Sequence, residues 1–179
     1  MISRAPLVLD SEMLDEARTF LRLEEADLDP SLGGVILSAV AAAEDFLNLM
    51  LLRRSVTETL DASTDWLRLG AAPVTAISAV ELVDPSGTAV PVAPGDHAID
   101  IDGSGAGWVR IVHPPPRARI RIGYTAGMAT AWSVLPEAIR LGVLRLAGYI
   151  FGHRDGADDP GPPASVVALL KPWRRIRLS

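Results

Sequence analysis

Few residues in this chain are of types that could form a catalytic or metal site. Three of them lie close together in the sequence, near its middle. His97, Asp100 and Asp102 combine an imidazole with two carboxylates, and divalent metals accept both kinds of ligand. The chain holds only three histidines, and no HxxxH pair or second cluster supports such a site. A small metal-dependent enzyme built on these residues is therefore the least favoured of our hypotheses.

Other motifs that carry chemistry are absent or incomplete. The glycine-rich stretch 103–107 resembles a dinucleotide-binding loop, but no helix is predicted after it and a hairpin tip explains it better. Asp100 and Asp102 resemble the start of a calcium loop, yet the position that needs a bidentate glutamate is Ile111. There is no P-loop, no GxSxG elbow and no cysteine. The sequence predicts no catalytic residue, no metal and no cofactor.

The charge of the chain is unevenly distributed. The 179 residues carry a net charge of -5, but positions 1–50 hold ten acidic residues against three arginines, and positions 164–179 hold four basic residues and no acid. The basic residues are almost all arginine, whose guanidinium suits pairing with carboxylates or phosphates. An acidic end and a basic end favour head-to-tail assembly of copies, and solvated surface charge is the alternative.

A second basic feature is a predicted strand. Arg117, Arg119 and Arg121 alternate with small or apolar residues, so a strand over 117–124 would place three guanidiniums on one face. This face could contact phosphates or an acidic partner, or could simply be solvated. No aromatic residue alternates with these arginines, so contact with DNA would be non-specific and electrostatic.

Hydrophobic periodicity predicts the elements around these residues. Two helical patterns occupy 14–51, divided by Asp29-Pro30, and a third helix begins at Leu135-Pro136. Between them the apolar period changes to that of strands, with turn signals at Asp84-Pro85-Ser86-Gly87 and at Pro94-Gly95. We find no internal repeat, no signal-peptide core and no apolar run long enough to span a membrane.

The predicted fold class is α+β in a single domain, 1–179. A helical bundle core of three main helices plus a short C-terminal helix takes 10–54 and 133–154, and a small antiparallel β unit is inserted over 55–125. The stretch 155–163, rich in glycine, proline and aspartate, is predicted as a flexible link. It precedes a basic docking helix and tail, 164–179.

Several segments, taken in order, carry a resemblance. They are LDEARTFLRLEEADLD (14–29), AAAEDFLN (41–48), PVTAISAVELVDPSG (73–87), RIGYTAGM (121–128), LPEAIRLGVLRLAGYIFGHRD (135–155) and VVALLKPWRR (166–175). In their order and spacing the chain resembles the head–tail connector, or adaptor, proteins of tailed bacteriophages and gene transfer agents, in particular the longer members with a β insert.

The resemblance implies a structural role without catalysis. Family members form a ring, typically a dodecamer, in the neck between capsid and tail, where they join the portal to the stopper or tail and extend the DNA channel. It implies assembly in the bacterial cytoplasm and no membrane partner. It also implies that the tail reaches the portal and that the arginine strand lines the channel or an intersubunit seam. The tail residues are Val166, Leu169, Leu170, Lys171, Trp173, Arg174, Arg175, Ile176 and Arg177.

Two alternatives stay open at this stage. One is a cytosolic accessory protein that binds DNA through Arg117, Arg119 and Arg121, which predicts salt-sensitive DNA binding by the isolated subunit. The other is the metal-dependent enzyme, which predicts bound metal and loss of activity on His97→Ala.

Overall fold

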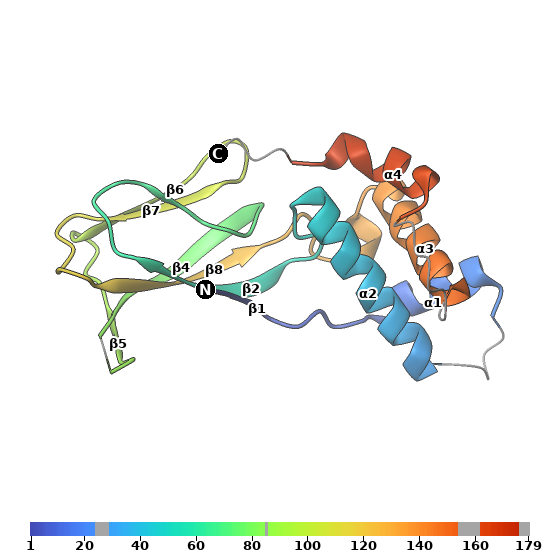
Figure 1. The fold of residues 1–179 in the computed structure, drawn as a ribbon, viewed down its shortest axis with the longest axis horizontal. Coiled ribbons are helices and arrows are strands. Elements are labelled where there is room, and N and C mark those ends of the chain that lie inside the picture. The colour runs from blue at the N-terminus through green and yellow to red at the C-terminus, as the bar shows by residue number, and fades with distance from the viewer. Residues whose placement is uncertain (24–28, 85, 154–161, 176–179) are drawn as a thin grey trace. The chain divides into compact units, whose positions relative to one another are not determined.

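The structure is a computed structural model of residues 1–179 that describes positions 1–23, 29–84, 86–153 and 162–175 (Figure 1). The chain divides into two compact units. The β unit comprises Met1–Pro6 and Leu52–Met128, and the helical unit comprises Leu7–Leu51 and Ala129–Ser179. The predicted link at 155–163 lies largely outside the described residues.

The β unit contains two antiparallel sheets. The larger sheet has five strands in the order β1-β2-β8-β4-β5, and the smaller has three in the order β3-β7-β6. The strands of the larger sheet are β1 (Ile2–Arg4), β2 (Arg54–Asp61), β4 (Val74–Val83), β5 (Ala89–Pro91) and β8 (Arg119–Ala126). Those of the smaller sheet are β3 (Leu67–Arg68), β6 (His97–Ile101) and β7 (Gly107–Ile111).

Strand β8 is the centre of the larger sheet because one of its faces is apolar. Ile120, Ile122 and Tyr124 alternate along it and are buried, as the period of two in the sequence predicts. Its neighbours are β2 on one side and β4 on the other, with two register shifts in β4. These buried side chains form the core of the unit together with Val109 and Ile111 of β7.

The predicted start of this strand is wrong by two residues. Arg117 precedes β8, in a turn in which the backbone N–H of Ala118 donates to the Pro115 carbonyl at 3.1 Å. Its φ of 58° places it in the left-handed region, where no strand residue lies. The alternating pattern of the sequence continues past the end of the strand because the prolines before Arg117 impose a turn that the pattern does not reveal.

The described residues of the helical unit form four α-helices. They are α1 (Ser11–Leu21), α2 (Asp29–Leu47), α3 (Glu137–Gly152) and α4 (Ala164–Leu170), with short 3-10 turns η1 (Trp132–Val134) and η2 (Lys171–Trp173). Asp10 caps α1, since its carboxylate accepts from the Met13 N–H at 2.8 Å. Arg22 ends this helix in the left-handed conformation.

Helix α3 packs mainly against α2 and α4. The apolar stripe predicted for α2 is buried at Leu32, Ile36, Ala39, Val40, Ala43 and Leu47, and that of α3 at Ile139, Gly142, Val143, Leu146 and Ala147. The small alanines of α2 permit close approach of the two helices. None of the described helices has the length and apolar character needed to cross a bilayer.

The fold is therefore α+β, and the part of the chain that the structure describes forms four α-helices and two antiparallel sheets. The β unit is larger than the small insert that the sequence predicts, because eight strands are formed by segments of only two to ten residues. The chain leaves the helical unit at Leu51 and returns at Ala129, and the Ala129 N–H donates to the Leu51 carbonyl at 3.0 Å. The two ends of the interruption are thus neighbours in space.

Candidate interaction surfaces

The C-terminal segment combines a buried side and an exposed side. Val166 and Leu170 of α4 are 1% and 2% exposed and pack within the helical unit. A Cβ added at Gly142 would lie 2.8 Å from Leu170 Cδ2, so glycine is what permits this close contact. Leu169 is half-buried. These apolar residues stabilise the chain's own fold.

The exposed side of the segment carries the basic residues. Lys171, Trp173 and Arg174 are exposed, and the Arg174 guanidinium lies 5.2 Å from the Phe46 ring centroid. The Arg175 N–H donates to the Leu47 carbonyl at 2.9 Å, which fixes the end of the segment on α2. Ile176 and Arg177 lie outside the described residues. An exposed tryptophan beside cationic groups is a composition typical of a binding surface.

The arginine face of β8 is reduced to two residues by the fold. Arg119 and Arg121 lie on the same face of β8, and Arg117 lies outside the strand. In the register of the sheet, Asp61 of β2 is opposite Arg119, and Glu81 of β4 is opposite Arg121. Residues directly opposite on an antiparallel pair share a face. The acids therefore offset much of the positive potential, which weakens the hypothesis of an accessory DNA-binding protein.

The three residues of the hypothetical metal site are not brought together. His97 and Asp100 are three positions apart on β6, so their side chains leave opposite faces, and His97 Nδ1 lies 2.9 Å from the Ala93 carbonyl oxygen. Within the part of the chain that the structure describes, no group of three His, Cys, Asp or Glu side chains is placed to hold a metal. His97, Asp100 and Asp102 therefore do not form the metal site that the hypothesis of a metal-dependent enzyme requires.

Asp102 has a structural role in the hairpin tip instead. Its Oδ1 accepts from the Ser104 hydroxyl at 2.6 Å and from the Ala106 N–H at 3.0 Å, and its Oδ2 accepts from Trp108 Nε1 at 3.1 Å. These hydrogen bonds, above all that of the Ser104 hydroxyl, hold the pKa of the Asp102 carboxyl well below its usual range. The carboxylate closes the turn between β6 and β7.

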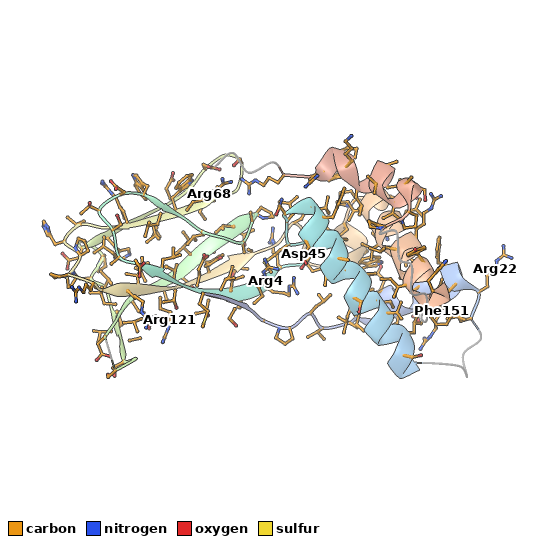
Figure 2. All side chains as sticks on the ribbon, viewed as in Figure 1. Arg4, Arg22, Asp45, Arg68, Arg121 and Phe151 are labelled. Atoms are coloured by element: carbon orange, nitrogen blue, oxygen red, sulfur yellow. The ribbon has the colours of Figure 1, made fainter. Side chains whose placement is uncertain are left out.

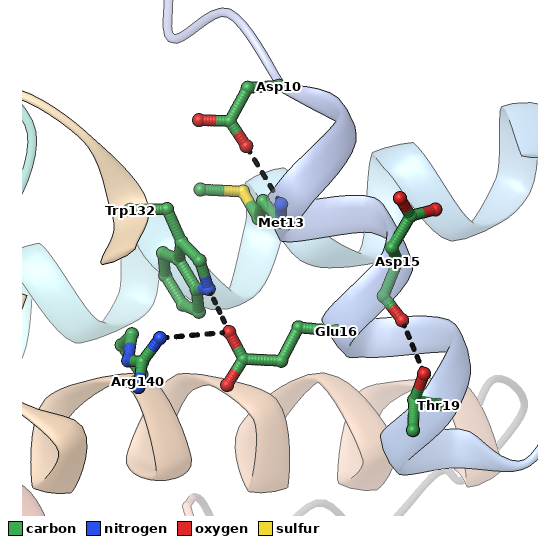
Figure 3. A network of polar contacts seen from close by, with 7 residues as sticks. All are labelled: Asp10, Met13, Asp15, Glu16, Thr19, Trp132 and Arg140. Atoms are coloured by element: carbon green, nitrogen blue, oxygen red, sulfur yellow. Dashed lines mark hydrogen bonds and ion pairs between the residues drawn. The ribbon is translucent and has the colours of Figure 1, made fainter. Parts of the chain in front are cut away.

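A groove between α1 and α3 is lined by acidic side chains. It has a volume of about 730 Å³ and is bordered by Glu12, Asp15, Glu16 and Glu137, with Arg140 among them. At its floor Glu16 Oε2 accepts from Trp132 Nε1 and lies 3.3 Å from Arg140 Nη1 (Figure 3). This network connects α1 to η1 and α3. It gives a structural role to Glu16, one of the ten acidic residues in positions 1–50.

The structure buries two glutamates, Glu44 and Glu58, whose burial the sequence did not predict. Glu58 of β2 is 7% exposed, and its Oε2 accepts from the Tyr124 hydroxyl at 2.7 Å and from the Gly70 N–H at 2.8 Å. The Tyr124 oxygen in turn accepts from the Ala71 N–H at 3.1 Å. Burial, together with the Glu58 carboxylate, raises the pKa of Tyr124 well above its usual range. Glu44 of α2 is 5% exposed and accepts from the Leu51 N–H at 2.8 Å.

The smaller sheet carries a ladder of tryptophan and arginine that the sequence analysis missed. Arg68 Cζ lies 5.9 Å from the Trp108 ring centroid, and Arg110 Cζ lies 5.0 Å from that of Trp66. Two Trp-x-Arg tripeptides produce it, since β3 pairs with β7 antiparallel with Arg68 opposite Trp108. Each tripeptide thereby places its arginine beside the tryptophan of the other. The repeated tripeptide was the signal available in the sequence.

Comparison with known proteins gives matches only among solved structures. No protein-family model and no curated protein matches the chain. A chain of the neck of an empty gene transfer agent (GTA) particle, computed with C6 symmetry, is 27% identical with a TM-score of 0.78. Chains of the virion of a native GTA particle and of the neck of a native GTA particle, computed with C12 symmetry, are each 28% identical, with TM-scores of 0.77 and 0.74.

These similarities extend over both chains almost completely. Each covers 100% of this chain and 97% of the other. Both the helical and the β unit are therefore included in the match. The chain is similar, over its whole length, to a chain found in the neck of gene transfer agent particles.

Proposed function

We propose that this protein is a structural subunit of the neck of a gene transfer agent particle or tailed phage. In this proposal it forms a ring that joins the portal to the stopper or tail and extends the channel through which DNA passes. The observation that carries the proposal is the full-length similarity, at 27–28% identity, to a neck chain. Identity spread over the whole of both chains favours a shared role more strongly than a shared fold alone.

The proposed ring contains twelve copies. The similar neck structures were computed with C6 and C12 symmetry, and a dodecamer is compatible with both. A ring of identical subunits requires two different, complementary surfaces on each copy. The separation of acidic and basic charge along the chain supports that requirement.

The proposed portal contact is the exposed side of the C-terminal segment. Lys171, Trp173 and Arg174 are available on this side, and Ile176 and Arg177 extend it in the sequence. Val166, Leu169, Leu170 and Arg175 hold the segment in place. A tryptophan with neighbouring guanidiniums would supply an apolar anchor together with directed hydrogen bonds to acidic groups on the portal.

The proposed channel or intersubunit face is that of Arg119 and Arg121, with Arg117 in the adjoining turn. Asp61 and Glu81 lie opposite the two strand arginines, so the face is nearly neutral. A channel that DNA must traverse benefits from weak attraction, because strong phosphate binding would slow passage. No catalytic residue, metal or cofactor is part of the proposal.

Deletion of the gene for this chain tests the proposal. Particles made without it should contain filled heads and separate tails but few joined particles, as counted by electron microscopy. The wild-type gene supplied in trans should restore joining, and a tagged chain should be located at the neck. Complete, joined particles that lack the polypeptide would refute the proposal.

A further inference from the structure

The two margins of the smaller sheet differ in chemistry. The strand order β3-β7-β6 makes β3 one margin and β6 the other. Buried Val109 and Ile111 define the inner face of β7, so Trp108 and Arg110 belong to its outer face. The outer face and its two margins are therefore available for contact with another molecule.

The β3 margin is aromatic and cationic. Trp66 is 43% exposed, and Arg68, which is labelled on the β unit in Figure 2, is half-buried. Arg110 stacks on the Trp66 ring and Arg68 on that of Trp108, so the four side chains present one continuous surface. Asp65, next to Trp66, lowers the net positive charge of this margin. The aromatic side chains of the margin therefore matter for binding as much as its charge does.

The β6 margin is acidic and apolar. Asp100 is opposite Trp108 and Ala98 is opposite Arg110, so both lie on the outer face. Asp96 continues this row, because the Val112 N–H donates to the Asp96 carbonyl at 2.8 Å. Asp96 and Asp100 are exposed. On the inner side of the same strand Ile99 and Ile101 remain 45% and 39% exposed.

We propose that these margins bind one another between neighbouring copies of this chain. Arg68 and Arg110 of one subunit would face Asp96 and Asp100 of the next. The margins match in charge, which favours a second copy over nucleic acid, whose phosphates the acidic margin would repel. A contact between two different surfaces propagates around a ring. The inference rests on the proposed ring and deepens it by naming the surfaces.

Crosslinking between two single-cysteine variants of the full chain tests the contact. The chain contains no cysteine, so Thr64→Cys beside the β3 margin and Ala98→Cys on β6 introduce unique thiols and retain all the charged residues. With a short bismaleimide, the mixture of the two variants should give crosslinked heterodimers, whereas each variant alone should give few. Crosslinking of either variant to itself but not to the other would overturn the proposal, as would no crosslinking.

Charge reversal provides a second test with a matched control. Arg68→Glu/Arg110→Glu and Asp96→Lys/Asp100→Lys should each weaken self-association by roughly tenfold or more, since like charges then meet. Mixing the two variants should restore association, because the reversed margins complement each other. The control, Arg53→Glu/Arg145→Glu, reverses two exposed charges outside this sheet and should associate like wild type.

Sedimentation velocity measures the self-association of the variants and of their mixture. Its outcomes distinguish a failure of this inference from a failure of the proposed function. Unchanged association of the reversed variants, or a mixture that stays monomeric, would overturn the inference even where the chain occupies the neck of particles. Charge-dependent association of a chain that is absent from particles would support the interface and refute the neck assignment.

Discussion

Gly142 of α3 lies directly against Leu170 of α4, so closely that a Cβ at position 142 would come within 2.8 Å of Leu170 Cδ2 and 3.1 Å of its Cγ. The glycine lowers the intrinsic helix propensity of α3 by about 1 kcal/mol relative to alanine. The contact offsets this cost because it allows the C-terminal helix to bury Leu170 to 2% exposure.

Enlarging residue 142 should therefore destabilise the helical unit. We expect Gly142→Val to lower the free energy of unfolding by about 1–3 kcal/mol through overpacking against Leu170, as measured by urea denaturation. Leu170→Ala alone should cost about 2–4 kcal/mol by leaving a cavity. The double variant should be more stable than the sum of the two losses predicts. Strict additivity would contradict the packing described here.

Tyr124 should make stability fall at alkaline pH. Its pKa in the folded protein is raised above the usual 10.0, so the folded state holds the phenolic proton more tightly than the unfolded state. The resulting stabilisation is fully present below pH 10 and is lost as the pH rises beyond it. Tyr124→Phe should reduce this pH dependence and cost about 1–3 kcal/mol at neutral pH, since Glu58 and the Ala71 N–H lose a partner.

Urea denaturation at pH 8 and at pH 11 measures this effect. Tyr149, which is half-buried and stacks on His153 at 4.2 Å, provides the control, because Tyr149→Phe leaves the Glu58 network intact. An identical alkaline loss in Tyr124→Phe and wild type would show that another group is responsible.

Asp102 should make stability fall at acidic pH. Its pKa is lowered in the folded state, most strongly by the Ser104 hydroxyl. The stabilisation is therefore present above the unfolded value of 3.8 and is lost as the pH falls below it. In Asp102→Asn the decrease in unfolding free energy between pH 5 and pH 3 should be smaller than in wild type, and Asp100→Asn should behave like wild type. The same decrease in all three proteins would exclude this role of Asp102.

Trp173 should be needed for assembly but not for folding. It is 38% exposed, so Trp173→Ala should change the free energy of unfolding by less than about 1 kcal/mol. If the exposed side of the segment binds the portal, incorporation of the variant into particles should fall by roughly tenfold or more, as expected for a central aromatic anchor. Quantitative immunoblots of purified particles measure this loss. Val134→Ala, which removes another exposed apolar side chain, should be incorporated normally.

The helical part of the fold was largely predictable from the sequence. Leu32, Ile36 and Val40 repeat at helical spacing because one stripe of α2 must be buried, and the proline before Glu137 marks the start of α3. These signals are local, so a short window of sequence contains them. The same is true of the apolar alternation in β8, although its first residue was misplaced at Arg117.

The pairing in the β unit was not predictable in this way. Arg68 and Trp108 meet because β3 pairs with a strand forty residues further on, and local periodicity contains no information about such partners. Buried Glu44 and Glu58 were missed for a related reason. A glutamate is expected at the surface, and only the fold brings the Leu51 and Gly70 N–H donors to these carboxylates.

The hydrogen bond between Leu51 and Ala129 has a consequence for how such a protein can be engineered and can diversify. Because the chain departs and returns at adjacent points, a short loop could close the gap if the intervening segment were removed or exchanged. Lengthening, shortening or transplanting that segment would then leave the packing of the remaining helices unchanged. The sequences of the helical unit and of the inserted segment are therefore free to change at different rates.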